Sequence, residues 1–116
     1  TITGLGDLWS KQCRPEKCLN KKSYATHLLL CHNPDAKDIL RDYHWDLMLA
    51  GHTHGGQFRI PFVNFAPFAP VKDLSMTEGL HSSHGKPIFI TRGVGNVYGV
   101  RINCRPEVSL LELANS

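Results

Sequence analysis

The sequence predicts a mixed α/β fold, and three observations lead to that prediction. Residues 25–31 and 46–50 are two short apolar runs bounded by polar residues, as expected of buried strands. Between them, residues 36–43 are compatible with a helix, and the last third of the chain alternates strand and turn signals. The order strand, helix, strand favours a layered α/β structure, whose chemistry lies where strands end in polar loops.

The first half of the chain supports this order element by element. Residues 1–9 are expected to hold the end of a strand and a loop, and residues 10–23 a polar, basic surface loop. Pro34 stops the strand at 25–31, because the residue before a proline avoids helical angles. Asp35 is the expected N-cap of the helix that follows. Two apolar side chains mark the inner face of that helix, Ile39 and Leu40.

The second half is expected to be richer in strands. Residues 57–60, 86–91 and 108–113 read as strands. Residues 61–71 contain three prolines and three phenylalanines, which indicates an ordered loop packed by its own aromatic rings. The expected core consists of aliphatic side chains in the apolar runs: Leu28, Leu30, Leu47, Leu49, Ile88, Ile90 and Leu110.

Length, charge and composition restrict the class of protein. The 116 residues are enough for one small domain, here residues 1–116, and a hydrophobic fraction of 41% allows a core. The net charge of +3 comes without a dense basic stripe, which argues against a nucleic-acid interface. No apolar run reaches the roughly 18 residues of a membrane span. We expect a cytoplasmic location, or a membrane-associated or exported one if an N-terminal segment is missing.

The cysteine spacing shows neither a CxxC pair nor a zinc-ribbon pattern. A core of this size needs no disulfides, so we expect reduced, structural thiols. A zinc site that uses the first two cysteines is the alternative. The four cysteines are Cys13, Cys18, Cys31 and Cys104.

Three histidines follow the carboxyl ends of predicted buried strands. His32 follows the run at 25–31, while His52 and His54 follow the run at 46–50 and lie between glycines. Parallel neighbouring strands would bring the two loops together, and imidazole is a common ligand of Zn, Mn and Fe ions. A His-x-His pair alone is weak evidence, so the prediction rests on the joint pattern. Four histidines lack this context and are expected on the surface or in loops: His27, His44, His81 and His84.

These motifs resemble those of a known enzyme family. The sequence GHTHGGQ at 51–57 resembles the last metal-binding motif of the calcineurin-like metallophosphoesterases, and LCHNPD at 30–35 resembles the motif before it. The segments GLGDLW at 4–9, TRGVG at 91–95 and CRPEV at 104–108 resemble the YaeI-like bacterial phosphodiesterase branch. The resemblance covers essentially the whole chain.

The resemblance implies the C-terminal half of a four-layer α/β/β/α sandwich with two divalent metal ions, Mn, Zn or Fe. His32 and His52 would bind one ion and His54 the other, and a metal-bridging hydroxide would attack a phosphodiester substrate. Two polar side chains, Asn33 and Gln57, are candidates for orienting the imidazoles. Arg92 and Arg101 could contact phosphate, and the alternative for each is a surface or salt-bridging arginine.

The sequence departs from the family in lacking its earlier motifs. An Asp-x-His, a Gly-Asp-x-x-Asp and a Gly-Asn-His are absent, so the chain lacks a bridging carboxylate. We therefore expect it to need the N-terminal half of the same domain, and to be weakly active or inactive alone. Two alternatives stay open: a non-catalytic metal-binding or scaffold derivative of the same fold, and an unrelated hydrolase with one zinc held by three histidines.

Overall fold

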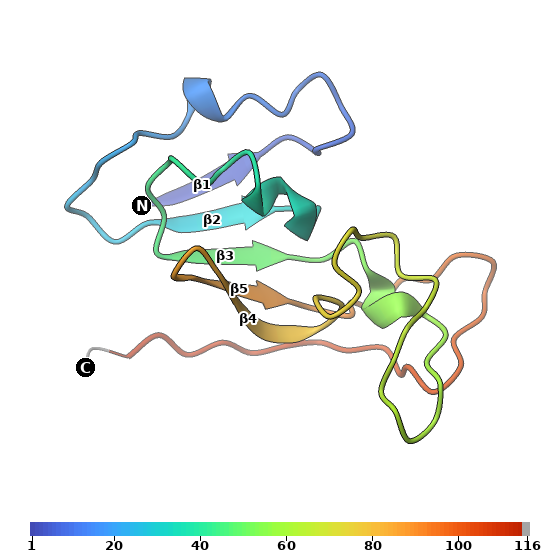
Figure 1. The fold of residues 1–116 in the computed structure, drawn as a ribbon. Helices are drawn as coiled ribbons and strands as arrows, with labels where there is room; N and C mark the ends of the chain where they lie inside the picture. Colours follow the sequence, from blue (N-terminus) through green and yellow to red (C-terminus); the bar gives the residue numbers. More distant parts are fainter. Residues whose placement is uncertain (115–116) are drawn as a thin grey trace.

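The computed structural model describes residues 1–114 of the chain and shows one twisted sheet with loops at its carboxyl end (Figure 1). The strands lie in the order β1 (Ile2–Leu5), β2 (Leu28–Cys31), β3 (Leu47–Ala50), β5 (Lys86–Ile90) and β4 (Gly79–Ser83). The first four are mutually parallel, and β4 pairs antiparallel with β5. The predicted α/β class is therefore confirmed, as a mixed five-stranded sheet with few helices.

The hairpin between β4 and β5 is explained by its two turn residues. Ser83 pairs with Lys86, which leaves His84 and Gly85 as the loop, and both have positive φ angles of 52° and 75°. Two left-handed residues in succession match the right-handed twist of the flanking strands. The turn thus places the antiparallel edge strand β4 beside the parallel part of the sheet.

The helix expected over residues 36–43 is wrong. Within residues 1–114 the helices are all short 3₁₀ helices, η1 (Pro15–Lys17), η2 (Pro34–Lys37) and η3 (His54–Gly56). The cap of η2 is Asn33 and not Asp35, because the Asn33 Oδ1 atom accepts a hydrogen bond of 2.9 Å from the Asp35 amide. Residues 38–43 continue as turns; of the two apolar side chains expected inside, Leu40 is buried and Ile39 is 46% exposed. A segment this short is marginal as a helix without an extended apolar face.

The core lies on one face of the sheet. Alternate strand residues point into it, and apolar side chains from the connections cover them. The buried strand residues are Leu29, Cys31, Met48, Ala50, Ile88 and Ile90, and they pack against Leu19, Ala36, Leu40, Trp45 and Met76.

The expected core is confirmed for Ile88 and Ile90 and wrong for the other five side chains. The leucines at 28, 47 and 49 are half-buried on the opposite face, and Leu30 is 44% exposed there. The runs at 28–31 and 47–50 are apolar at every position, so their sequence does not reveal which face is covered. Leu110 is 98% exposed.

Two predicted strands are not formed within the described residues. Residues 57–60 make only isolated bridges, from Phe58 to Ile102 and from Ile60 to Phe65. Residues 108–113 belong to an extended segment that runs back past β4 and β5 without joining the sheet (Figure 1). Both segments have strand-like composition, but a strand also needs a hydrogen-bonded neighbour along its length.

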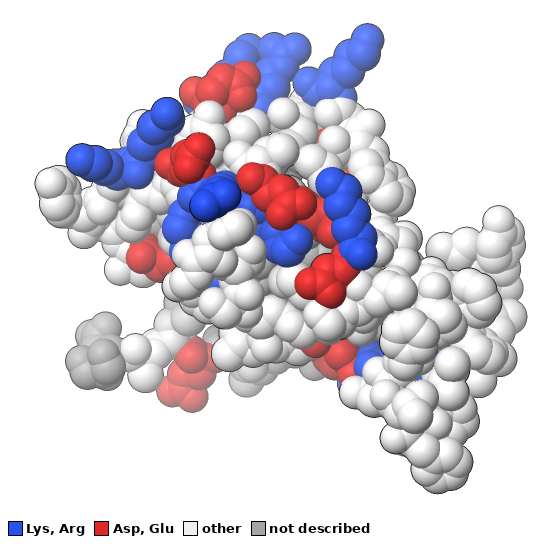
Figure 2. Space-filling model, viewed as in Figure 1, with Lys and Arg blue, Asp and Glu red and all other residues white. Residues whose placement is uncertain are grey.

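Two loops form a lobe beyond the carboxyl ends of the strands. Residues 57–71 and 93–103 make up this lobe, which carries few charged side chains on the face that Figure 2 shows. The loop predicted at 61–71 is confirmed, but its rings do not pack among themselves: Phe62 and Phe68 are largely exposed. Across the part of the chain that the structure describes, no helix is long and apolar enough to cross a membrane.

Candidate functional site

Two of the three predicted site histidines meet at the carboxyl ends of neighbouring strands. His32 comes directly after β2 and His52 two residues after β3, and these strands pair in parallel. The His52 Nδ1 atom lies 3.2 Å from the His32 Nε2 atom, with the rings nearly perpendicular at 80°. The Gly51 amide donates to the His32 carbonyl at 3.0 Å, which ties the two loops together.

The backbone around this pair fixes where the imidazole protons lie. The His52 Nε2 atom is 3.1 Å from the Pro70 carbonyl oxygen, which can only accept a hydrogen bond. Nε2 therefore carries the proton, and Nδ1 of the neutral ring presents its lone pair to His32. It follows that the His32 Nε2 atom is the donor in this pair.

The third histidine is held separately. The His54 Nδ1 atom lies 3.0 Å from the Gly95 carbonyl oxygen, so it carries the proton and Nε2 keeps the lone pair. Within residues 1–114, no three side chains of His, Cys, Asp or Glu lie close enough to hold one ion. The structure thus brings His32 and His52 together and leaves His54 outside that pair.

The loop that carries these histidines has an unusual backbone. His52 and His54 both have left-handed φ angles, of 66° and 51°, which cost free energy for residues with a side chain. Gly55 follows at 63°, and a Cβ atom there would lie 2.6 Å from the Arg92 Cγ and Cys104 Sγ atoms. Glycine adopts this angle without strain, and the close packing beneath the loop leaves no room for a side chain at this position.

Thr53 anchors this loop, and it was not predicted as a site residue from the sequence. Its side chain is buried between the two histidines; the hydroxyl donates to the Thr77 carbonyl at 2.7 Å and accepts from the Gly55 amide at 3.1 Å. Thr77 lies just before β4, so the hydroxyl joins the histidine loop to the edge of the sheet. A small residue inside a metal-binding motif is the only hint available in the sequence.

The surroundings of His52 favour its neutral form. Burial and the adjacent His32 lower the pKa of His52, against opposing effects of the Pro70 carbonyl, Asp7 and Asp35. The ring of Trp9 packs edge-on against His52, with ring centroids 4.5 Å apart. Neutral imidazole is the form that ligates metal ions.

Asn33 and Gln57 contact backbone groups and not the imidazole rings. Asn33 is fully buried and caps η2, while its Nδ2 atom has no hydrogen-bond partner in the described chain. The Gln57 side chain pairs with the backbone of Val97, donating to its carbonyl at 3.1 Å and accepting from its amide. Gln57 thereby connects the two loops of the lobe.

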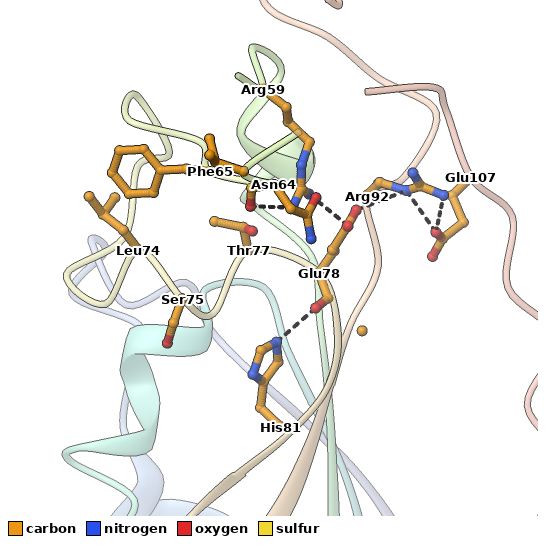
Figure 3. Close-up of a pocket in the computed structure, with 12 residues that line it drawn as sticks. Arg59, Asn64, Phe65, Leu74, Ser75, Thr77, Glu78, His81, Arg92 and Glu107 are labelled. Atoms are coloured by element: carbon orange, nitrogen blue, oxygen red, sulfur yellow. Dashed lines mark hydrogen bonds and ion pairs between the residues drawn. The ribbon is translucent and has the colours of Figure 1, made fainter. Parts of the chain in front are cut away.

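Arg92 lies in a chain of ion pairs along a cavity of about 740 Å³ (Figure 3). Its guanidinium bonds to Glu107 at 2.8 Å and to Glu78 at 3.2 Å, and Glu78 bonds in turn to the buried Arg59 at 2.7 Å. Arg59 also donates to the Gly55 carbonyl at 3.3 Å. The alternating charges of this chain of ion pairs neutralise one another. Arg92 therefore contacts carboxylates, and its side chain lies beneath the histidine loop.

A smaller apolar pocket of about 300 Å³ adjoins His54 in the lobe. It offers mostly hydrophobic surface next to a histidine whose Nε2 atom has a free lone pair. Its apolar lining consists of Phe58, Phe68, Pro70, Val97 and Tyr98.

The histidine pair fits a shared divalent ion. Two nitrogens bound to one tetrahedral zinc at about 2.0–2.1 Å lie roughly 3.3 Å apart, close to the separation in the pair. The observed distance between the His32 and His52 nitrogens is 3.2 Å. The spacing and the nitrogen donors therefore suit Zn, Mn or Fe, provided that the proton on the His32 Nε2 atom moves to Nδ1.

Comparisons with known proteins place these motifs in a family. No family model and no solved structure matched the chain. It is 52% identical over 112 residues to phosphodiesterase YaeI of Escherichia coli, and 37% identical over 118 residues to the uncharacterized metallophosphoesterase YkoQ of Bacillus subtilis. It is 30% identical over 118 residues to UDP-2,3-diacylglucosamine pyrophosphatase LpxG of Chlamydia muridarum.

The three matches span 97%, 97% and 95% of this chain, but only 40%, 42% and 36% of the relatives. The chain therefore spans about two fifths of the length of these relatives. The histidine motifs and the similarity along nearly the whole chain point to the same family. The chain belongs to the metallophosphoesterase family and corresponds to the C-terminal part of its YaeI-type members.

Proposed function

We propose that the chain provides the histidine part of a metal-dependent phosphodiester hydrolase. The observation that carries the proposal is the 3.2 Å contact between the His52 Nδ1 and His32 Nε2 atoms at the ends of adjacent parallel strands. The relatives named as a phosphodiesterase and a pyrophosphatase support the same class of reaction, hydrolysis of a phosphoester.

In this proposal His32 and His52 hold one ion and His54 holds a second through its Nε2 atom. Divalent ions in a paired site supply Lewis acidity for phosphoester hydrolysis and stabilise the negative charge that develops. The chain's own contribution is to hold the His52 and His54 rings each in one tautomer. The Pro70 and Gly95 carbonyls bind the protonated nitrogens, and Thr53 holds the loop between them.

We further propose that the chain is weakly active or inactive by itself. No carboxylate joins the histidines to complete a group of three ligands within residues 1–114. The bridging carboxylate and remaining ligands would come from the N-terminal half of the same domain. Without them, imidazoles can bind an ion, but nothing fixes two ions at one separation.

The pocket beside His54 favours a phosphodiester that carries an apolar group. Phe68 and Tyr98 expose large apolar surfaces there, next to the proposed ligand nitrogen. A relative from Chlamydia is named for a substrate that combines a nucleotide with a diacylated sugar. An acylated substrate would place its apolar part on this pocket and its phosphoester toward the histidines.

A fusion experiment tests the proposed function. The segment of YaeI that precedes the matched region is fused to this chain, and hydrolysis of bis-p-nitrophenyl phosphate is measured with added Mn²⁺ or Zn²⁺. We expect metal-dependent turnover by the fusion, little by the chain alone, and a loss of at least about 100-fold in the fusion carrying His52→Ala. His84→Ala, in the exposed hairpin turn, is the matched control. A folded fusion without turnover would contradict the hydrolase proposal and favour a scaffold.

A further inference from the structure

Arg101 lies beneath the histidine loop with all three of its guanidinium nitrogens bonded to backbone carbonyls. Its Nη1 atom donates to the His54 carbonyl at 3.1 Å, and its Nη2 atom donates to the Arg92 and Gly93 carbonyls at 2.9 and 3.1 Å. One side chain thus joins the loop that carries His54 to the glycine-rich segment at 92–95. The sequence suggested a phosphate contact for Arg101, but in the structure its guanidinium donates to backbone carbonyls of the chain.

The carbonyl of Gly95 is where this network reaches the imidazole. It accepts from the Arg101 Nε atom at 3.1 Å and from Nη2, and it also faces the His54 Nδ1 atom at 3.0 Å. A carbonyl oxygen has two lone pairs, so the two guanidinium donors share one acceptor site and the imidazole can use the other. The rigid fork of the guanidinium therefore determines where the acceptor of the His54 proton lies.

The histidine loop has supports other than Arg101. A change at Arg101 can therefore affect the position of the His54 ring without unfolding the loop. The Cys104 Sγ atom lies 3.3 Å from the His54 carbonyl and 3.4 Å from the Gly55 carbonyl, and Arg59 and Thr53 hold Gly55 as well. These contacts do not touch Gly95. Loss of the Arg101 side chain would therefore release the Gly95 carbonyl while the loop keeps most of its anchors.

We propose that Arg101 is a positioning residue for His54. It holds the Gly95 carbonyl so that the imidazole keeps its proton on Nδ1 and presents the Nε2 lone pair. The benefit for metal binding rests on the proposed function, whereas the effect on the tautomer does not. Outer partners of ligand imidazoles typically change metal affinity by about 10- to 100-fold.

The test uses nitrogen-15 spectra of the histidine rings in the metal-free chain, with the variants Arg101→Gln and Arg101→Lys. We expect His54 to be the Nδ1–H tautomer in the native chain and a mixture of tautomers in Arg101→Gln. Lysine keeps the positive charge but lacks the planar fork of guanidinium donors, so the spectrum of Arg101→Lys should be intermediate. Arg101→Lys also replaces Arg101→Gln in the test if Arg101→Gln fails to fold. Arg105→Gln is the matched control, because Arg105 is an exposed arginine four positions away.

Calorimetric titration of the YaeI fusion with Zn²⁺ completes the experiment. In the native fusion and in Arg105→Gln we expect two zinc ions to bind, and in Arg101→Gln we expect the affinity for the ion held by His54 to fall by about 10- to 100-fold while the other is unchanged. An unchanged His54 tautomer in Arg101→Gln would overturn the positioning role, and a changed tautomer with unchanged zinc affinity would overturn its benefit for metal binding. If the native fusion takes up no zinc, the metal proposal fails, and the ring spectra still decide the role of Arg101.

Discussion

The Nδ1 atom of His52 faces the Nε2 atom of His32 at 3.2 Å, and the proton between them belongs to His32. This assignment follows because the other His52 nitrogen donates to the Pro70 carbonyl, which leaves Nδ1 as an acceptor. The same two nitrogens are the ones proposed to share an ion. The pair is therefore preorganised in spacing, and one proton must leave its position before both nitrogens can act as ligands.

The first prediction concerns that proton. When Zn²⁺ is added to the metal-free chain, we expect His32 to change from the Nε2–H tautomer to the Nδ1–H tautomer, while His52 keeps its proton on Nε2. Nitrogen-15 spectra of the imidazole rings report both. The resonances of His84, in the exposed turn between β4 and β5, provide the internal control. A His32 ring that stays protonated at Nε2 in saturating zinc would rule out its role as a ligand through that atom.

The second prediction concerns the apolar pocket. In the YaeI fusion, Phe68→Ala should raise KM for a phosphodiester bearing an acyl chain by about 10-fold, because it removes an apolar contact worth roughly 1–2 kcal/mol. KM for bis-p-nitrophenyl phosphate should change much less. Phe62→Ala is the matched control, since Phe62 is also an exposed phenylalanine of the same loop but does not line the pocket. Equal effects of Phe68→Ala on both substrates would argue against an acyl-binding role.

The third prediction concerns thiol reactivity. Burial raises the pKa of Cys31 to about 11, so that at pH 8 roughly one thiol in a thousand is the reactive thiolate. Cys31 and Cys104 are buried, whereas Cys18 is exposed and Cys13 is partly exposed. Iodoacetamide followed by peptide mass spectrometry should therefore modify Cys18 and Cys13 well before the other two. Early labelling of Cys31 in folded chain would contradict the packing of β2.

The fourth prediction concerns pH and the C-terminal segment. The Ser109 hydroxyl and the Arg92 guanidinium lower the pKa of Glu107, although burial opposes them. A lowered folded-state pKa means that the Glu107 carboxylate stabilises the fold above its unfolded pKa, and that this stabilisation is lost as pH falls through the folded value. Glu107→Gln should therefore lower the free energy of unfolding by about 1 kcal/mol at pH 7 and by much less at pH 3.

Urea denaturation at both pH values measures this difference. The matched control is Glu112→Gln, because Glu112 is exposed in the same segment. An equal loss of stability at pH 7 and pH 3 in Glu107→Gln would show that its charge contributes nothing.

The fifth prediction distinguishes the two faces of the sheet. Leu29 is fully buried, so Leu29→Ala should lower the free energy of unfolding by about 2–5 kcal/mol through lost burial and a new cavity. The neighbouring Leu30 is 44% exposed on the opposite face, and Leu30→Ala should cost about 1 kcal/mol or less. Urea denaturation of the two variants compares them directly. The reverse order would mean that the opposite face is the better covered one.

The sequence allowed the positions of His32 and His52 to be predicted because local signals were sufficient. Short apolar runs mark β2 and β3; His32 follows its run directly, and His52 follows its run after one glycine. The partners that fix the protons could not be predicted, because Pro70 and Gly95 lie 18 and 41 residues away from the imidazoles that they bind. Backbone carbonyls carry no residue-specific signal, so only the folded structure identifies them.

The errors in the fold have a related cause. The run at 28–30 consists of three leucines, and such a run does not show which face of a strand is covered. The helix expected at 36–43 and the strand expected at 108–113 were inferred from propensity, which is a weak guide without knowledge of the tertiary partners. The strands β3 and β5 were predicted well because each is bounded by polar residues or turns.

The left-handed backbone at His52 and His54 sets stability against activity in this loop. Each such angle costs about 1–2 kcal/mol for a residue other than glycine, and asparagine adopts it more readily than histidine does. Glycine or asparagine at both positions would therefore make the loop more stable, but the loop would lose its imidazoles. Two histidines in this conformation carry a free-energy cost that a functional imidazole at each position would explain.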